Sequence, residues 1–221
     1  MTFAVTIRCD LRVAFGDVRN QGDRPTCLAF ALSDTHRAAR SLNEPLSAEH
    51  LYYHAVYRTP MGNPHLGIGL PEACAALKLD GQSVETAWPY LVSVPNDLKQ
   101  WKPPANATRL YRSDVQPAAD KVAAIMAQLD VQQPVILILL LGERFYRPID
   151  GFISPGPQDT DTDYHAVIAA GHGQAPNGEL FILVRNSWGR DWGLEGYGWI
   201  AAAYLAARLK DALAITPGTV L

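Results

Sequence analysis

Cysteine is scarce in this chain, and the few cysteines present follow no pairing pattern. The 221 residues include three, Cys9, Cys27 and Cys74. An odd, low number argues against a disulfide framework and is typical of a reducing compartment. Neither CxxC spacing nor an HExxH motif occurs, so the sequence predicts no metal site, and no motif indicates a cofactor.

An excess of charge of one sign and long hydrophobic runs are also missing. The 19 basic and 22 acidic residues leave a formal net charge of −3, which gives no basis for binding nucleic acid or an anionic membrane. The longest apolar run, residues 134–141, is far too short to span a bilayer. The first residues lack the basic and apolar regions of a secretory signal. We therefore expect a cytoplasmic protein, or one exported without a recognisable N-terminal signal.

What the chain does contain is a helical first half and a strand-rich second half. Apolar residues at helical spacing predict three helices in the first half. The first has Asp23 as its N-cap and Pro25 in its first turn, and the other two start at Ser47 and near Pro71. A fourth helix is predicted over residues 117–129. The predicted strands cover residues 135–141, 166–170, 180–185 and 197–201. Helices first and strands later predict an α+β protein with two lobes.

The segment from Asn20 to Phe30, NQGDRPTCLAF, places Cys27 in the first turn of a predicted helix. The backbone N–H groups and the dipole at a helix start favour a thiolate over a thiol. Gln21 lies in the loop before the helix. Its amide can donate, alongside the backbone N–H of Cys27, to the oxygen of a tetrahedral intermediate.

Two segments of the second half supply a base and its partner. His165 stands at the start of the apolar strand YHAVIAAG, where it can face a groove and exchange a proton with a thiol. Asn186 ends the strand LFILVRN and can accept a hydrogen bond from the imidazole, fixing its tautomer. The following Trp188 can shield that hydrogen bond from water.

These three segments resemble the papain family of cysteine proteases in order and spacing. The family carries Gln-Gly…Cys-x-Ala-Phe at a helix start, a His-Ala strand and an Asn-Ser-Trp-Gly…Trp-Gly…Gly-Tyr block. The resemblance covers roughly residues 10–200. It implies a two-lobe papain-like fold in one catalytic domain, with a helical lobe over about 10–100, a β-rich lobe over about 108–221 plus the N-terminal strand, and a groove between them. It also implies a cysteine endopeptidase that acts on protein or peptide substrates through an acyl-enzyme and needs no cofactor.

The same resemblance indicates which residues bind substrate and where this chain departs from the family. The implied substrate-binding residues are Gly69, Leu70, Pro71, Ile138, Tyr164, Ala166 and Trp188. Arg24 stands where the family usually has a disulfide cysteine, and Leu28 replaces the tryptophan after the nucleophile. The chain is thus expected to be a disulfide-free variant.

The remaining cysteines and histidines have no partner pattern. We expect Cys74 in the core of a helix and Cys9 packed in a strand. The other histidines are expected to be ordinary surface or half-buried residues: His36, His50, His54, His65 and His172. The run Asp159 to Asp163 resembles the start of a calcium loop but lacks its glycine and closing Glu, which favours a solvated acidic loop.

Two other functions remain open. An acyltransferase or peptide cyclase would use the same residues, and the mass of products formed with an amine acceptor would distinguish it. A catalytically inactive papain-like binding module has no chemical need for an intact triad plus Gln21. If Met1 is the native start, the chain carries no inhibitory N-terminal segment, and a separate inhibitor or docking protein becomes an expected partner.

Overall fold

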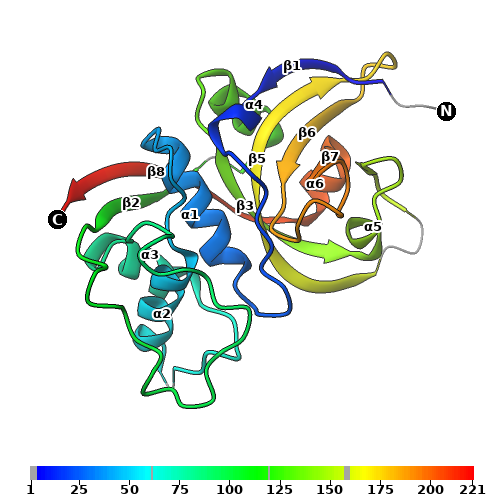
Figure 1. The fold of residues 1–221 in the computed structure, drawn as a ribbon. Coiled ribbons are helices and arrows are strands. Elements are labelled where there is room, and N and C mark those ends of the chain that lie inside the picture. Colours follow the sequence, from blue (N-terminus) through cyan, green and yellow to red (C-terminus); the bar gives the residue numbers. More distant parts are fainter. Residues whose placement is uncertain (1–3, 61, 119, 157–159) are drawn as a thin grey trace. The chain divides into compact units, whose positions relative to one another are not determined.

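The computed structural model describes residues 4–60, 62–118, 120–156 and 160–221, which form an α+β fold (Figure 1). The helices are the 3-10 turn Arg12–Ala14, α1 (Cys27–Ala39), α2 (Ala48–Arg58), α3 (Leu70–Leu79), α4 (Val122–Asp130), α5 (Glu143–Tyr146) and α6 (Ala202–Arg208). The strands are β1 (Thr6–Asp10), β2 (Tyr111–Pro117), β3 (Val135–Gly142), β4 (Phe152–Ile153), β5 (Asp161–Gln174), β6 (Leu180–Arg185), β7 (Tyr197–Ala201) and β8 (Leu209–Val220).

The chain divides into two compact units. Residues 1–20 and 117–214 form one, here called the β unit, and residues 21–116 and 215–221 form the other, the α unit. Within the described residues, no helix combines the length and the apolar character needed to cross a membrane.

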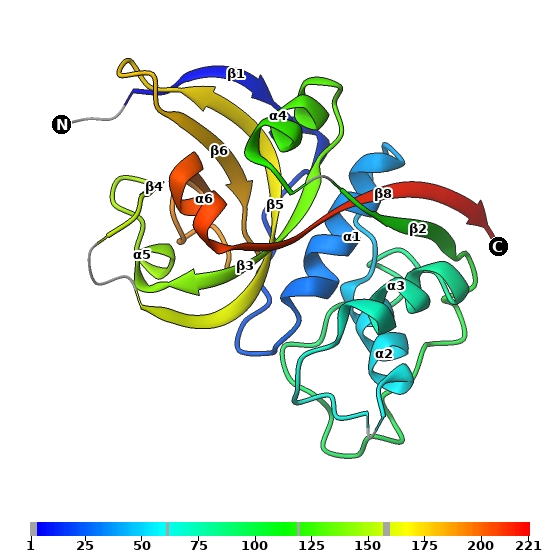
Figure 2. The same ribbon diagram turned by 180° about the vertical axis from the view of Figure 1, so that it is seen from behind.

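Strand β5 is the centre of the β unit. It pairs antiparallel with β1, β3 and β6. The sheet continues from β6 to β7 and β4, and from β3 to the first half of β8. Residues 165–170 of β5 are all buried, as expected for a strand covered on both faces. Helices α4 and α6 pack against β3, and both are in view in Figure 2.

The strand predictions are confirmed where the sequence is strongly apolar. The predicted strands 135–141, 180–185 and 197–201 are β3, β6 and β7, and 166–170 is the middle of the longer β5. Strands β2 and β8 were not predicted. Their outer halves are mostly exposed, so they lack the apolar alternation by which a strand is recognised.

Two of the predicted helices, α2 and α3, are confirmed. The Ser47 hydroxyl caps α2 by accepting the backbone N–H of His50 at 3.0 Å. The helix predicted over 117–129 is wrong at its start, because α4 begins only at Val122. Pro117 instead ends β2, and the next residue, Ala118, donates its N–H to Ala212 of β8.

The predicted start of α1 needs the same kind of correction. The N-cap is Thr26 rather than Asp23, and Cys27 is the first helical residue. Pro25 disfavours helical geometry in the residue before it, so a helix cannot pass through Arg24. The Thr26 side chain does not cap the helix but hydrogen-bonds the Tyr90 hydroxyl at 2.9 Å.

Several single-residue expectations about burial are also corrected. Cys9 is buried in β1 as predicted, whereas Cys74 is only half-buried. The expectation of a surface or half-buried position holds for His54, which is half-buried, and for His65, which is exposed. It is wrong for three buried histidines, each of which has a polar partner distant in sequence: His36 with Gln82, His50 with Ser83 and His172 with Asp130.

A buried ion pair holds the loop before α1 against the rest of the α unit. The Arg24 guanidinium contacts both carboxylate oxygens of Glu49 at 2.6 and 3.0 Å, and both side chains are almost fully buried. The same carboxylate accepts the indole N–H of Trp101 at 2.6 Å and the backbone N–H of Leu91 at 3.0 Å. Its charge is therefore fully compensated, which a buried carboxylate requires.

We expect the change Glu49→Gln to destabilise the protein by about 3–5 kcal/mol, because it leaves the Arg24 charge buried without its counter-ion. Urea unfolding followed by circular dichroism measures the loss. The matched control is Asp114→Asn, which breaks the exposed pair with Lys78 in the same unit and should cost less than about 1 kcal/mol. Equal losses in the two variants would contradict this account of the buried pair.

Candidate active site

In the β unit, His165 and Asn186 form a buried hydrogen-bonded pair. Antiparallel pairing of β5 with β6 sets the first half of β5 beside the end of β6, where Asn186 follows the strand. The His165 Nε2 lies 2.7 Å from the Asn186 Oδ1, and both residues are buried. The partnership predicted from the sequence is thus present in the structure.

The neighbouring backbone fixes which atoms of this pair donate and accept. The backbone N–H of Ser187 donates to the Asn186 Oδ1 at 2.8 Å, which identifies that atom as the carbonyl oxygen of the amide. An oxygen that accepts from Ser187 also accepts from His165, so Nε2 carries the ring proton. In the neutral imidazole, Nδ1 then holds the lone pair that a base needs.

Aromatic side chains cover the imidazole. The Trp188 ring centroid lies 4.5 Å from that of His165, and the Phe145 centroid lies 5.8 Å away. The Trp192 indole N–H donates to the Phe145 backbone carbonyl at 3.0 Å, which holds this short α5 segment in place. Trp188 therefore shields the His165–Asn186 bond, as the sequence predicted, and Phe145 adds a second cover.

Burial governs the electrostatics of this histidine. It lowers the pKa of His165 to about 4, while the Asn186 hydrogen bond and the Asp163 carboxylate act in the opposite direction. The imidazole is thus neutral at neutral pH and can accept a proton. A neighbouring anion would raise the pKa again.

In the α unit, Cys27 and Gln21 occupy the start of α1 and the loop before it. Cys27 is half-buried and is the first residue of the helix, where the helix dipole favours a thiolate. The Gln21 side-chain amide donates to the Arg24 carbonyl at 2.9 Å, and the Tyr90 hydroxyl donates to the Gln21 carbonyl at 2.7 Å. The Gln21 side-chain amide has two N–H groups, and its bond to the Arg24 carbonyl uses one of them to orient the side chain.

The predicted substrate-binding residues fall into separate groups. Ile138 and Ala166 lie directly opposite each other on β3 and β5, and Tyr164, two residues earlier in β5, is largely exposed. Trp188 borders a surface hollow of about 540 Å³ in the β unit. The remaining group belongs to the α unit and consists of Gly69, the N-cap of α3, followed by Leu70 and Pro71 in its first turn.

Sequence reasoning missed two contributors to these sites. Phe145 lies in a four-residue helix, and no motif marks it. Tyr90 belongs to the sequence Trp-Pro-Tyr, and its hydroxyl connects Thr26 and Gln21. Asp159 lies outside the described residues, while Asp163 belongs to β5 rather than to a loop.

A possible metal-binding group lies elsewhere in the described part of the β unit. It consists of Cys9, Asp130 and His172. His172 is on the same strand as His165 but on the order of 20 Å further along it.

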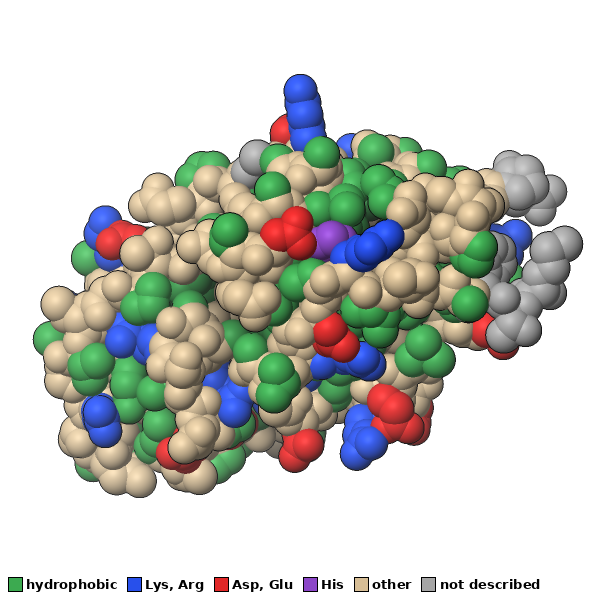
Figure 3. All heavy atoms as spheres, turned by 90° about the horizontal axis from the view of Figure 1, so that it is seen from above, with side chains coloured by type: hydrophobic (Ala, Val, Ile, Leu, Met, Phe, Trp, Pro, Cys, Tyr) green, Lys and Arg blue, Asp and Glu red, His purple; other side chains and the backbone are tan. Residues whose placement is uncertain are grey.

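One face of the molecule carries mixed charge. On the face drawn in Figure 3, acidic and basic side chains are interspersed among apolar ones, in keeping with the formal net charge of −3.

Known proteins resemble this chain over part or all of its length. Cysteine proteinase RD21A of Arabidopsis thaliana is 36% identical over 85 residues, which are 38% of this chain and 18% of that protein. A cathepsin L-like peptidase of Aedes aegypti is 28% identical over 185 residues, which are 81% of this chain and 53% of that protein. The chain thus spans about half the length of the latter and much less of the former.

Solved structures share the fold at low sequence identity. Xylellain, a cysteine protease from Xylella fastidiosa, superimposes with a TM-score of 0.77 at 22% identity, over 98% of this chain and 88% of that one. The bromelain protease from Ananas comosus, in complex with the E64 inhibitor, gives a TM-score of 0.71 at 23% identity, over 94% and 97% of the two chains. The fold is therefore papain-like.

The family description of papain family cysteine proteases matches residues 7–211. This range contains both the His165–Asn186 pair and the helix start with Cys27. Since the match covers nearly the whole sequence, the chain belongs to the papain family of cysteine proteases.

Proposed function

We propose that the protein is a cysteine endopeptidase in which Cys27 is the nucleophile, His165 the proton carrier, Asn186 its positioning residue and Gln21 an oxyanion donor. The observation that carries the proposal is the buried 2.7 Å hydrogen bond between His165 and Asn186 under Trp188. A neutral imidazole with a fixed tautomer has a clear use as a base. Membership of the papain family indicates that the group this base deprotonates is the Cys27 thiol.

The proposed reaction has two steps. The His165 Nδ1 takes the proton of the Cys27 thiol, and the thiolate attacks the peptide carbonyl carbon, whose oxygen gains a negative charge that the Gln21 amide and the Cys27 backbone N–H stabilise. The His165 imidazolium gives its proton to the leaving amine as the C–N bond breaks, and a thioester remains. Water, deprotonated by His165, then attacks the thioester and releases the acid and the thiolate.

Acyl transfer is the second candidate, because it needs the same groups. An amine in place of water in the second step would form a new peptide bond. The surface hollow beside Trp188 is the observation that keeps this candidate open, since an acceptor amine could bind there. Mass spectrometry of products with and without a free amine acceptor separates hydrolysis from transfer.

We expect Cys27→Ala to lower kcat/KM on a peptide substrate by about 10⁴-fold or more while the circular dichroism spectrum is unchanged, because covalent catalysis is lost. E64, the inhibitor in the bromelain structure, should add one adduct by intact mass to the wild-type chain and none to this variant. The matched control is Cys74→Ala, which removes another half-buried cysteine and should keep both activity and labelling. Full activity in Cys27→Ala would refute the proposed mechanism.

Asn186→Ala should reduce kcat/KM less than His165→Ala does. Loss of a positioning residue misplaces the imidazole and costs about 10²-fold, whereas loss of His165 removes proton transfer altogether. The Asn186 hydrogen bond raises the pKa of His165, so the alkaline limb of the pH–rate profile should move to lower pH in Asn186→Ala. A larger loss at 186 than at 165, or an unmoved alkaline limb, would show that the two roles are misassigned.

The substrate residue one position before the scissile residue, P2, should be apolar. The residues that the family resemblance assigns to P2 recognition, Leu70, Pro71, Ile138 and Ala166, are all apolar. Burying an aliphatic side chain stabilises binding by about 1.5–3 kcal/mol, roughly 10- to 100-fold in kcat/KM. A positional peptide library measures this, and Asp163 allows some acceptance of Lys or Arg.

The structure offers matched variants for that library. Ile138→Ala and Leu70→Ala should each weaken the P2 preference, whereas Val13→Ala, at a 93% exposed position, should leave it unchanged. A clear preference for an acidic P2 residue would contradict the proposed pocket.

A further inference from the structure

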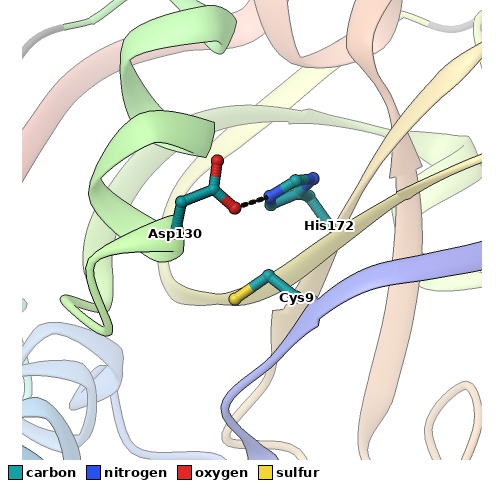
Figure 4. Close-up of side chains that lie close together, drawn as sticks. All are labelled: Cys9, Asp130 and His172. Atoms are coloured by element: carbon teal, nitrogen blue, oxygen red, sulfur yellow. Dashed lines mark hydrogen bonds and ion pairs between the residues drawn. The ribbon is translucent and has the colours of Figure 1, made fainter.

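Three side chains of metal-ligand type converge in the β unit away from His165. Cys9 comes from β1, Asp130 is the last residue of α4, and His172 belongs to β5 (Figure 4). One potential ligand atom of each residue, a sulfur, an oxygen and a nitrogen, lies within 4.8 Å of the other two.

The fold itself brings these residues together. Cys9 and His172 are direct cross-strand partners in the antiparallel pair of β1 and β5. The Cys9 thiol donates to the Leu129 carbonyl at 3.2 Å, which ties it to the last turn of α4 beside Asp130. Two strands and a helix end thus fix the cluster from three directions, although the residues lie far apart in the sequence.

The histidine of the cluster is partly unsatisfied in the described structure. His172 is 4% exposed, and its Nε2 lies 2.7 Å from the Asp130 Oδ1. Its Nδ1 is buried and has no hydrogen-bond partner among the described residues. The nitrogen that faces the Asp130 carboxylate, Nε2, is the one that can bind a cation in this cluster, and Nδ1 would then carry the ring proton.

The donor atoms fit one class of metal. Zinc takes thiolate sulfur at about 2.3 Å, imidazole nitrogen at about 2.0–2.1 Å and carboxylate oxygen at about 2.0–2.2 Å in tetrahedral geometry. Such a site sets its donors roughly 3–4 Å apart, within the 4.8 Å limit seen here. Calcium and magnesium prefer oxygen donors and fit poorly. The Asp130 side chain is 58% exposed, so it can rotate. Its hydrogen bond to His172 then breaks, and both groups can bind the cation.

We propose that Cys9, Asp130 and His172 bind a Zn²⁺ ion, with a water molecule as the fourth ligand. The Cys9 thiol gives its proton to solvent as the sulfur–zinc bond forms, and His172 binds through Nε2 as the neutral ring. Because all three ligands belong to the β unit, the ion fastens β1 and the end of α4 to β5. It has no part in the peptidase chemistry.

Cobalt(II), a spectroscopic substitute for zinc, tests this proposal directly. The Cys27→Ala chain is titrated with Co²⁺, so that the thiol of the proposed active site cannot contribute. We expect one equivalent to bind with a thiolate-to-cobalt charge-transfer band and tetrahedral d–d bands, and Zn²⁺ to displace it. Zinc should also raise the Tm of this chain, because it binds the folded form.

Three further variants in the same background locate the site. Cys9→Ser should abolish the charge-transfer band. Asp130→Ala should raise the Zn²⁺ dissociation constant at least about 100-fold, since loss of mere outer-shell partners already costs 10- to 100-fold. Cys74→Ser, the matched control, should retain the band and the affinity.

Asp130 is exposed, so Asp130→Ala keeps the test valid even if Cys9→Ser fails to fold. The proposal is overturned if no charge-transfer band forms. It is equally overturned if the band survives Cys9→Ser, or if Asp130→Ala changes the Tm without changing zinc affinity. The last result would assign the His172–Asp130 pair a structural role only.

Discussion

The β unit depends on the pairing of one long strand. Strand β5 hydrogen-bonds β1, β3 and β6, so its register determines where every neighbouring side chain lies. A slip of one residue would turn His165 away from Asn186 and exchange the buried and exposed faces of the strand. Burial of residues 165–170 makes such a slip costly in free energy. The positions of the His165–Asn186 pair and of the Cys9–Asp130–His172 cluster are therefore fixed by the apolar residues that surround β5.

In the α unit, a buried ion pair fixes the loop before α1. By family resemblance, Arg24 occupies the position of a disulfide cysteine, and here its guanidinium pairs with Glu49 on α2. A disulfide constrains the unfolded chain, whereas a buried ion pair stabilises only when its hydrogen bonds are complete. Trp101 and Leu91 complete them for Glu49. This arrangement needs no oxidising environment, and it holds the loop in which Gln21 donates to the Arg24 carbonyl.

The sequence was most informative where a residue's role depends on its immediate neighbours. The strands around Ala166 and Leu183 are strongly apolar, and Ser47 caps the helix that follows it, so these elements could be predicted. The pairing of His165 with Asn186 was predictable because both belong to specific motifs. By contrast, Asp130 reaches His172 across 42 positions, and no local pattern encodes that contact.

Other misses have equally physical causes. Asp23 is a good cap by residue type, but α1 starts later because Pro25 restricts the backbone of Arg24. Strand β8 is mostly exposed and was missed because its formation depends on partners already in place. Phe145 covers His165 from a short helix, a position that only the folded chain defines.

Burial of His165 has a cost as well as a benefit for the proposed chemistry. Covering the ring protects its bond to Asn186, but it also lowers the pKa from the ordinary 6.5 to about 4. That shift corresponds to roughly 3 kcal/mol against the imidazolium. A unit negative charge about 4 Å from the ring, at an effective dielectric constant near 20, contributes about 4 kcal/mol in its favour. An anion at that distance would therefore oppose the effect of burial and return the pKa of His165 toward its ordinary range. Burial thus keeps the imidazole neutral and able to act as a base, whereas a nearby anion would favour the imidazolium, which acts as an acid; a proton carrier needs both forms.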